Sequence, residues 1–182
     1  MRIGNTEVNF RQFIFLIIYY LFARYLPNST FFIFGKISKY FRYLCCKNIF
    51  SKCGYNVNIE RNAYFGTGVD LEIGNNSGIG ENCFVPSNIK IGNDVMMGRD
   101  CYIVDVNHNF DRIDIPIRLQ GSSVKKITII EDDVWIGRDV TITSGRHICK
   151  GTIIATKACV TKDFPEYCIL GGNPAKIIRY RV

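Results

Sequence analysis

The sequence has few of the features on which zinc chemistry and membrane crossing depend. Only two histidines, His108 and His147, occur among its 182 residues. A zinc centre held by three histidines therefore cannot be assembled in the usual way. The apolar run at 13–23 has eleven uncharged residues, whereas a membrane-spanning helix needs about 20. No small-x-small cleavage site follows this run, which disfavours a removed export signal.

The eight cysteines lack the spacing of a metal site. Cys45 and Cys46 are adjacent, and Cys83 and Cys101 stand where a small apolar side chain would serve. We therefore expect buried free thiols, which pack as small hydrophobic groups. Without an export signal, this pattern favours a reducing cytoplasm over a disulfide-stabilised scaffold.

The chain is organised by a repeat of six residues. Aliphatic side chains recur at this spacing, often followed by glycine: Ile73, Ile79, Val85, Ile91, Met97 and Ile103, then Ile130, Ile136, Ile142, Ile148, Ile154 and Val160. A period of six fits neither an amphipathic helix nor a two-faced strand. It predicts a mainly β solenoid, in which each three-sided turn places one short strand on each side and aliphatic residues inside. Antiparallel strands joined by glycine turns explain the fixed period less well.

The solenoid defines three regions. Residues 54–165 form the coil, with a longer and irregular first turn over 54–71. Residues 166–182 form a turn followed by a basic tail or a short helix. Residues 1–53 form a helical segment that carries the whole net charge of +7, since it holds eight lysines and arginines and one acid, Glu7. The remainder is neutral, which argues against binding of nucleic acid.

Two interpretations of the N-terminal segment stay open. Of the 24 aromatic residues in the chain, 14 lie in the first 50. Basic, aromatic-rich helices are typical of proteins that lie on an anionic membrane surface. A solenoid also needs a cap over its open end, and residues 1–50 could serve either purpose or both.

The repeat is interrupted once. Ile103 and Ile130 are 27 residues apart, which is not a multiple of six, so residues of about 105–126 must leave the coil. Long excursions from a compact repeat usually carry function. Asn107 and His108 stand where this excursion departs from the rigid coil, a placement that favours chemistry.

The ordered series of motifs resembles the hexapeptide-repeat acyltransferases, and in particular the maltose and galactoside O-acetyltransferases and their polysaccharide-modifying relatives. The motifs are the isoleucine–glycine repeat, the Asn-His excursion, Asp-Asp-Val-Trp-Ile-Gly at 132–137, Val-Thr-Lys-Asp at 160–163 and Gly-Asn-Pro-Ala-Lys-Ile-Ile-Arg at 172–179. The resemblance implies a left-handed parallel β-helix, a homotrimer with its sites between subunits, acetyl-CoA as acyl donor and no metal.

The resemblance also implies roles for individual residues. His108 is the expected general base, because a neutral imidazole is well suited to remove a hydroxyl proton near pH 7. Transfer is then direct, through a tetrahedral intermediate. Acceptor contacts are expected from Asp105, Asn107 and Trp135, and coenzyme A contacts from Trp135, Gly137, Thr156, Thr161, Lys162 and Arg179. Fixed cations pair well with the phosphates of coenzyme A.

Four of these side chains carry further expectations. Trp135 should point away from the coil, because Ile136 holds the inward position. Asp105 could orient His108 from three residues away. We interpret His147 as a surface turn residue. Arg146 replaces an inward aliphatic residue, so either the corner is distorted there or Arg146 faces a ligand or a subunit.

The predicted function is an acetyl-CoA-dependent O-acetyltransferase acting on a sugar hydroxyl in cell-surface polysaccharide biosynthesis. Its acceptor would be a sugar or glycan, and its location the cytoplasm or the inner face of the membrane. Two alternatives remain: a small-molecule acetyltransferase of the serine or xenobiotic type, and a non-catalytic β-helix scaffold, since a fold does not by itself imply chemistry.

Overall fold

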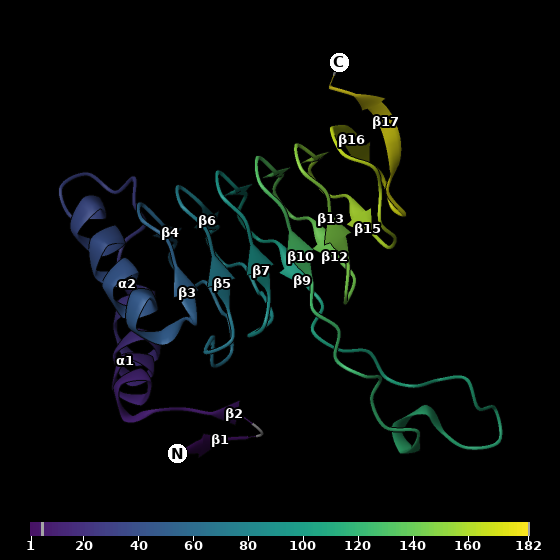
Figure 1. Ribbon diagram of the computed structural model, residues 1–182, viewed down its shortest axis with the longest axis horizontal. Coiled ribbons are helices and arrows are strands. Elements are labelled where there is room, and N and C mark those ends of the chain that lie inside the picture. Colours follow the sequence, from purple (N-terminus) through teal and green to yellow (C-terminus); the bar gives the residue numbers. More distant parts are fainter. Residues whose placement is uncertain (5, 182) are drawn as a thin grey trace.

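The computed structural model describes residues 1–4 and 6–181. It shows a three-sided β-solenoid of about six turns. Two helices cover the N-terminal end of the solenoid, and a single long loop projects from its side (Figure 1). The predicted β-solenoid with a helical N-terminal segment is confirmed.

Each side of the coil is a column of short parallel strands. The first face contains β3 (Lys52–Cys53), β5 (Glu72–Ile73), β7 (Lys90–Ile91), β10 (Ile129–Ile130) and β13 (His147–Ile148). The second contains β4 (Asn58–Ile59), β6 (Gly78–Ile79), β8 (Met96–Met97), β11 (Trp135–Ile136), β14 (Ile153–Ile154) and β16 (Cys168–Gly171). The third contains β9 (Tyr102–Ile103), β12 (Thr141–Ile142) and β15 (Cys159–Val160). On the second face, a hydrogen bond from the Gly78 amide to the Val95 carbonyl (3.0 Å) links consecutive turns.

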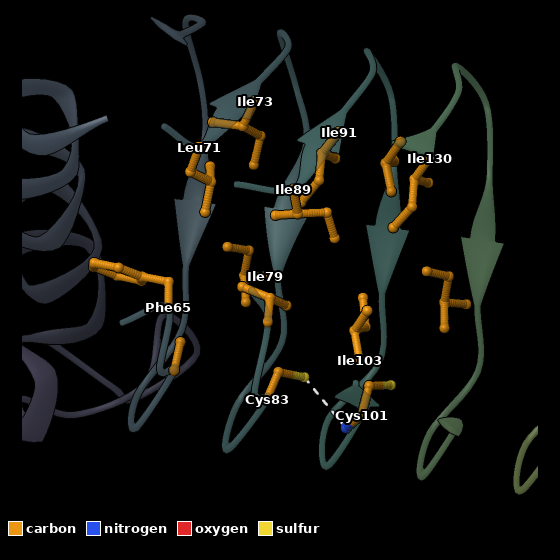
Figure 2. Packing of buried hydrophobic residues seen from close by; sticks show 14 of the residues in the cluster. Phe65, Leu71, Ile73, Ile79, Cys83, Ile89, Ile91, Cys101, Ile103 and Ile130 are labelled. Carbon is orange, nitrogen blue, oxygen red and sulfur yellow. Dashed lines mark hydrogen bonds between the residues drawn. The ribbon is translucent and has the colours of Figure 1, made fainter. Parts of the chain in front are cut away.

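The six-residue repeat is explained by stacking between turns. Ile73, Ile91 and Ile130 are aligned in register on the first face and are at most 4% exposed. Figure 2 shows such residues packed in layers inside the coil, with the Cys101 amide donating to the Cys83 thiol (3.3 Å). Burial of these layers is the main source of stability for a repeat whose turns contact only their neighbours.

The corners of the coil explain the asparagines and aspartates of the sequence. Eight of these residues have a φ between 52° and 62°: Asn56, Asn62, Asn76, Asn82, Asp94, Asp100, Asp133 and Asp139. Asn and Asp tolerate this left-handed conformation better than other residues with a Cβ. Their side chains also bond along the corner, as in Asn56 to Asn76 (3.1 Å) and Asn76 to Asp94 (3.0 Å).

Hydrogen bonds between turns show both irregularities that the sequence predicts. At one corner the Asn75 amide donates to the Asn93 side chain in the next regular turn, at a sequence separation of 18. The Tyr55 amide donates to the Asn75 side chain at a separation of 20, so the first turn is longer. The Asn93 amide donates to the Asp132 carboxylate at a separation of 39, because the excursion loop lies between them. This loop contains the short helix η2 (Ile117–Leu119) and extends away from the coil (Figure 1).

The N-terminal segment caps the coil. It contains β1 (Arg2–Ile3), β2 (Thr6–Glu7), α1 (Phe10–Leu21), η1 (Ala23–Tyr25) and α2 (Gly35–Ile49). The hydroxyls of Tyr19 and Tyr20 donate to the carbonyls of Ala63 (2.9 Å) and Gly66 (2.7 Å) in the first turn. The helices of this segment thus cover the end of the coil (Figure 1). Among the described residues, neither helix reaches the length and apolar character needed to cross a bilayer.

A buried arginine joins the cap to the coil. Arg42 of α2 is fully buried, and its guanidinium donates to carbonyls of Leu26 (3.1 Å), Pro27 (2.9 Å) and Ile59 and lies 3.4 Å from Glu60. These partners compensate for the loss of water around the charge. Burial raises the pKa of Glu60, but hydrogen bonds from Ser29 and Asn58, together with the charge of Arg42, outweigh it and lower that pKa overall.

The C-terminal segment is a strand, so the helix alternative for 166–182 is wrong in the described residues. β17 (Lys176–Tyr180) pairs antiparallel with β16. The pairing gives hydrogen-bond partners to the backbone groups of β16 at the edge of the second face. A helix in place of β17 would leave these groups without such partners.

Candidate active site

A groove lies between the base of the excursion loop and the following turns of the coil. Its volume is about 440 Å³. From the loop it is lined by residues 107–111 and by Ser123, Val124 and Lys126, and from the coil by Thr143, Ser144, Arg146 and Thr161. His108 is exposed and is the histidine that lines this groove. The groove therefore places one accessible imidazole among hydroxyl, amide and cationic groups.

Paired backbone segments hold His108 in place. His108 forms an antiparallel bridge with Ser122. On either side of it, the Asn109 amide donates to the Gly121 carbonyl (3.0 Å) and the Ser123 amide donates to the Asn107 carbonyl (2.8 Å). This two-stranded neck fixes the backbone of the expected base, as precise placement of a reactive group requires.

Asp105 anchors the loop and does not bond to His108. Its carboxylate lies 2.9 Å from the Lys125 ammonium, and its carbonyl accepts a hydrogen bond from the Ser144 hydroxyl (2.7 Å). The ion pair links the outgoing and returning segments of the loop. The orienting contact that the sequence allowed between Asp105 and His108 is thus replaced by a contact that closes the loop base.

Arg146 forms part of the coil side of the groove. Its guanidinium lies 3.4 Å from the Asp163 carboxylate and donates to the carbonyls of Thr161 and Ser144, both at 3.4 Å. The side chain is half-buried and lines the same groove as His108. This placement favours the interpretation that Arg146 faces a ligand.

A second group of predicted residues lies on the second face. Trp135 of β11 is 51% exposed, whereas Ile136 is fully buried, so the indole lies outside the coil as the repeat predicts. Gly137 follows at the corner, where a Cβ would come within 2.7 Å of the Thr156 amide nitrogen. Gly137 and Thr156 are therefore neighbours. Arg179 is exposed on β17 and pairs with Ile169 of β16 on the same face.

One chain does not bring the two groups together. The groove contains Asn107, His108 and Thr161, but not Trp135 or Thr156. Along the chain, the third face separates them, since β11 leads to β12 and then to the corner at 143–146. Lys162 follows Thr161, and its ammonium lies 5.5 Å from the centroid of the Phe164 ring.

Proteins similar to this chain in sequence and in structure include acetyltransferases. A Saccharomyces cerevisiae protein provisionally assigned as an acetyltransferase is 34% identical over 135 residues, which cover 73% of this chain and 67% of the yeast protein. A maltose O-acetyltransferase from Clostridium difficile has a TM-score of 0.73 at 26% identity, over 93% of this chain and 86% of that one. No family model matches the sequence.

The chain belongs to the hexapeptide-repeat acetyltransferases. Another solved member, from Vibrio cholerae and complexed with acetyl-CoA, has a TM-score of 0.70 at 28% identity, over 76% of this chain and 75% of that one.

Several curated relatives match over a shorter part of their length. The chain spans 31% of a Mycobacterium tuberculosis protein provisionally assigned as an acetyltransferase, at 38% identity over 94 residues, or 52% of this chain. It spans 26% of a chloramphenicol acetyltransferase from Agrobacterium fabrum, at 52% identity over 54 residues, or 30% of this chain.

The sequence did not reveal every residue of this candidate site. Lys126, Thr143 and Ser144 line the groove, yet no motif marks them. The interpretation of His147 as a turn residue is wrong, because it lies in β13 with its ring 2.7 Å from the Glu131 carboxylate. Its place in the repeat could have shown this, since His147 directly precedes the inward Ile148.

Proposed function

We propose that this chain is an acetyl-CoA-dependent O-acetyltransferase that modifies a sugar hydroxyl, with His108 as general base. The observation that carries the proposal is the exposed imidazole of His108 in a polar groove at the base of the loop. Membership of the hexapeptide-repeat acetyltransferases supports the type of reaction, and the acetyl-CoA complex of the Vibrio cholerae relative supports the donor.

The proposed reaction needs only one proton carrier. As the acceptor oxygen attacks the thioester carbonyl, the neutral imidazole of His108 takes the hydroxyl proton. The tetrahedral intermediate then collapses, the carbon–sulfur bond breaks, and the departing thiolate receives that proton from the imidazolium. A positioned general base contributes about 10²–10⁴-fold to such a rate.

We further propose a homotrimer in which two copies complete each site. Of the expected coenzyme A contacts, Gly137, Thr156 and Arg179 lie on the second face or at the corner that follows it, away from the groove that holds His108, whereas Thr161 lines that groove. A closed ring of identical chains can apply the second face of one copy to the groove of the next. Trp135, an exposed aromatic residue on that face, suits such a contact.

For the acceptor, we propose a sugar of a cell-surface polysaccharide or of its precursor. The groove presents Asn107, Ser123, Thr143 and Thr161, whose amide and hydroxyl groups suit a polyhydroxylated ligand. The maltose O-acetyltransferase neighbour supports a carbohydrate. A xenobiotic acceptor is the second candidate, since the local identity to a chloramphenicol acetyltransferase is high.

The cap supports a proposed contact with an anionic membrane surface. Its outer side exposes large apolar residues, among them Phe31, Phe32, Ile33, Phe34, Ile37 and Tyr40. Lys36 and Lys39 lie between them in the sequence. Exposed apolar side chains beside cations are what an interfacial helix offers to anionic lipid.

Replacement of His108 tests the reaction. We expect His108→Ala and His108→Gln to lower kcat about 10²–10⁴-fold, followed as acceptor-dependent release of coenzyme A from acetyl-CoA. Acceptors are simple glucosides, galactosides and chloramphenicol. Calorimetry is the control, because both variants should still bind acetyl-CoA. Unchanged turnover would refute the role of His108, and absence of acetyl-CoA binding by the native protein would favour a scaffold.

Two further measurements address the partners. Mass spectrometry of glycans from a strain lacking the protein should show the loss of acetyl groups if a polysaccharide is modified.

Sedimentation with vesicles containing phosphatidylserine should carry down the native protein, and less of Phe32→Ser. The matched control is Ile113→Ser, since Ile113 is as exposed as Phe32 but lies on the excursion loop. Equal sedimentation of both variants would refute lipid binding by the cap.

A further inference from the structure

Three side chains that can bind metal meet on the outside of the coil. Glu131 directly follows β10, His147 belongs to β13 and Cys149 directly follows β13. The His147 Nε2 lies 2.7 Å from the Glu131 Oε1. One carboxylate oxygen, one ring nitrogen and the thiol sulfur all lie within 4.8 Å of one another.

The register of the coil produces this meeting. His147 and Cys149 are two residues apart on an extended segment, so their side chains leave on the same side. Ile130 pairs with Ile148, which places Glu131 beside Cys149 in the next turn. All three residues are partly exposed, so a solvated ion can reach them.

At this corner of the coil, the cluster breaks the pattern of a glycine directly after the inward residue. In the first three turns, the residue after the inward position is Gly54, Gly74 or Gly92. A Cβ on Gly54 or on Gly74 would come within 2.6 Å of the backbone of the next turn. The fourth and fifth turns instead carry Glu131 and Cys149 at the corresponding positions. Two side chains able to bind metal thus replace glycine where His147 also lies.

The surroundings of the cluster are acidic. Burial raises the pKa of the Cys149 thiol, and the carboxylates of Glu131, Glu166 and Asp163 raise it further. The Lys150 amide donates to the second oxygen of Glu131 (2.7 Å), which holds this carboxylate in place. Negative potential around fixed ligand atoms favours a divalent cation.

We propose that Glu131, His147 and Cys149 bind a zinc ion. Zinc takes nitrogen, sulfur and oxygen ligands at about 2.0–2.3 Å, commonly in tetrahedral sets of four. The three side chains would supply three ligands and water the fourth. Binding would replace the hydrogen bond between Glu131 and His147 with two bonds to metal, and Cys149 would bind as a thiolate after releasing its thiol proton to water.

The site would join the fourth and fifth turns of the coil. It lies beside the groove but does not line it, since His147 directly follows Arg146 in the chain. The proposal therefore goes beyond the acetyl transfer, whose proposed mechanism uses no metal. The histidine count excluded a centre with three histidines, and a mixed site with one histidine falls outside that argument.

Cobalt is the probe that reports on the sulfur ligand. Untagged full-length protein is freed of metal with a chelator and titrated with Co²⁺, followed by the thiolate-to-cobalt charge-transfer absorbance. We expect saturation at one equivalent and full loss of the band when one equivalent of Zn²⁺ displaces the cobalt. Cys149→Ser and His147→Gln should each abolish the band.

The matched control is Cys159→Ser. Cys159 of β15 is also free and partly exposed, but it is not part of this cluster. It should keep the full absorbance. No band in the native protein, or a band that persists in Cys149→Ser, would overturn the proposal. Loss of the band in Cys159→Ser would overturn it as well.

Thermal melting gives a second readout that is independent of transferase activity. One equivalent of Zn²⁺ should raise the Tm of the native protein by several degrees, because a ligand that binds only the folded state stabilises it. Glu131→Gln should show no such shift. An equal shift in the native protein and in Glu131→Gln would contradict the site. Chelation should leave the acetyl transfer unchanged, so this test and the His108 test can fail separately.

Discussion

Combining two inactive variants tests whether a site is shared between copies. His108→Ala removes the base from the groove. Trp135→Ala with Thr156→Ala removes expected donor contacts from the second face. The replaced side chains of Trp135 and Thr156 are exposed, so the fold should tolerate both changes. If each site takes its groove from one chain and its second face from the next, an oligomer of the two variants contains some intact sites.

The expected magnitude follows from the arrangement. In a closed ring assembled at random from equal amounts of the two variants, half the grooves keep His108. Half of the neighbouring second faces keep Trp135 and Thr156. About a quarter of all sites are then intact, and in the mixed rings of three chains that purification through both tags retains, one site in three is intact. Each variant alone should retain about 1% of native activity or less, if its lost contacts act at the reacting atoms.

The assay is coenzyme A release by the co-expressed variants, purified through a different tag on each. Light scattering should show the mass of three chains. As a control, the two variants are purified separately and then mixed. This mixture shows how much activity arises without mixed oligomers. If the co-expressed oligomer is no more active than either variant alone, the site is not shared between copies, and the proposed arrangement is wrong.

Two further predictions concern stability. In Gly145→Ala, a left-handed φ of +71° costs about 1 kcal/mol, and overlap of the new Cβ with that of Lys126, 2.5 Å away, adds about 1–3 kcal/mol. Gly121→Ala is the control, because its φ is +75° with open space around it, and equal urea midpoints for the two variants would contradict this reasoning. The lowered pKa of Glu60 stabilises the fold above the unfolded-state pKa, and this stability is lost as pH falls through the folded-state pKa. As the pH is lowered below about 4.5, the free energy of unfolding should therefore decrease less in Glu60→Gln than in the native protein. Equal pH profiles would show that the contact between Glu60 and Arg42 is unimportant.

The coil and its interruption could be predicted from the sequence because their rule is local. Each inward residue stacks on the residue one turn away. The spacing of six residues can therefore be read directly from the sequence, as in the run from Ile73 through Ile79 and Val85 to Ile91. Counting residues then locates the loop and the longer first turn. His108 could be selected because it is one of two histidines and lies where the chain leaves the repeat.

The contacts between turns could not be predicted in the same way. Asp105 had two candidate roles, and only the return of the loop shows that Lys125 is its partner. β17 lies where the edge of β16 is free, a property of the folded coil and not of residues 176–180. The cap likewise depends on Tyr19 reaching Ala63, 44 residues away.

The period of six alone determined that this chain forms a solenoid, because one aliphatic residue per side is enough to fill a three-sided core. Only the tertiary structure decided which outward side chains meet. An outward residue faces a neighbour chosen by the register between turns, and the pairing of Ile91 with Ile130 across the loop sets that register for all later turns. For this reason Glu131 lies beside His147 and Cys149, and for the same reason Trp135 and His108 lie on different sides of one chain.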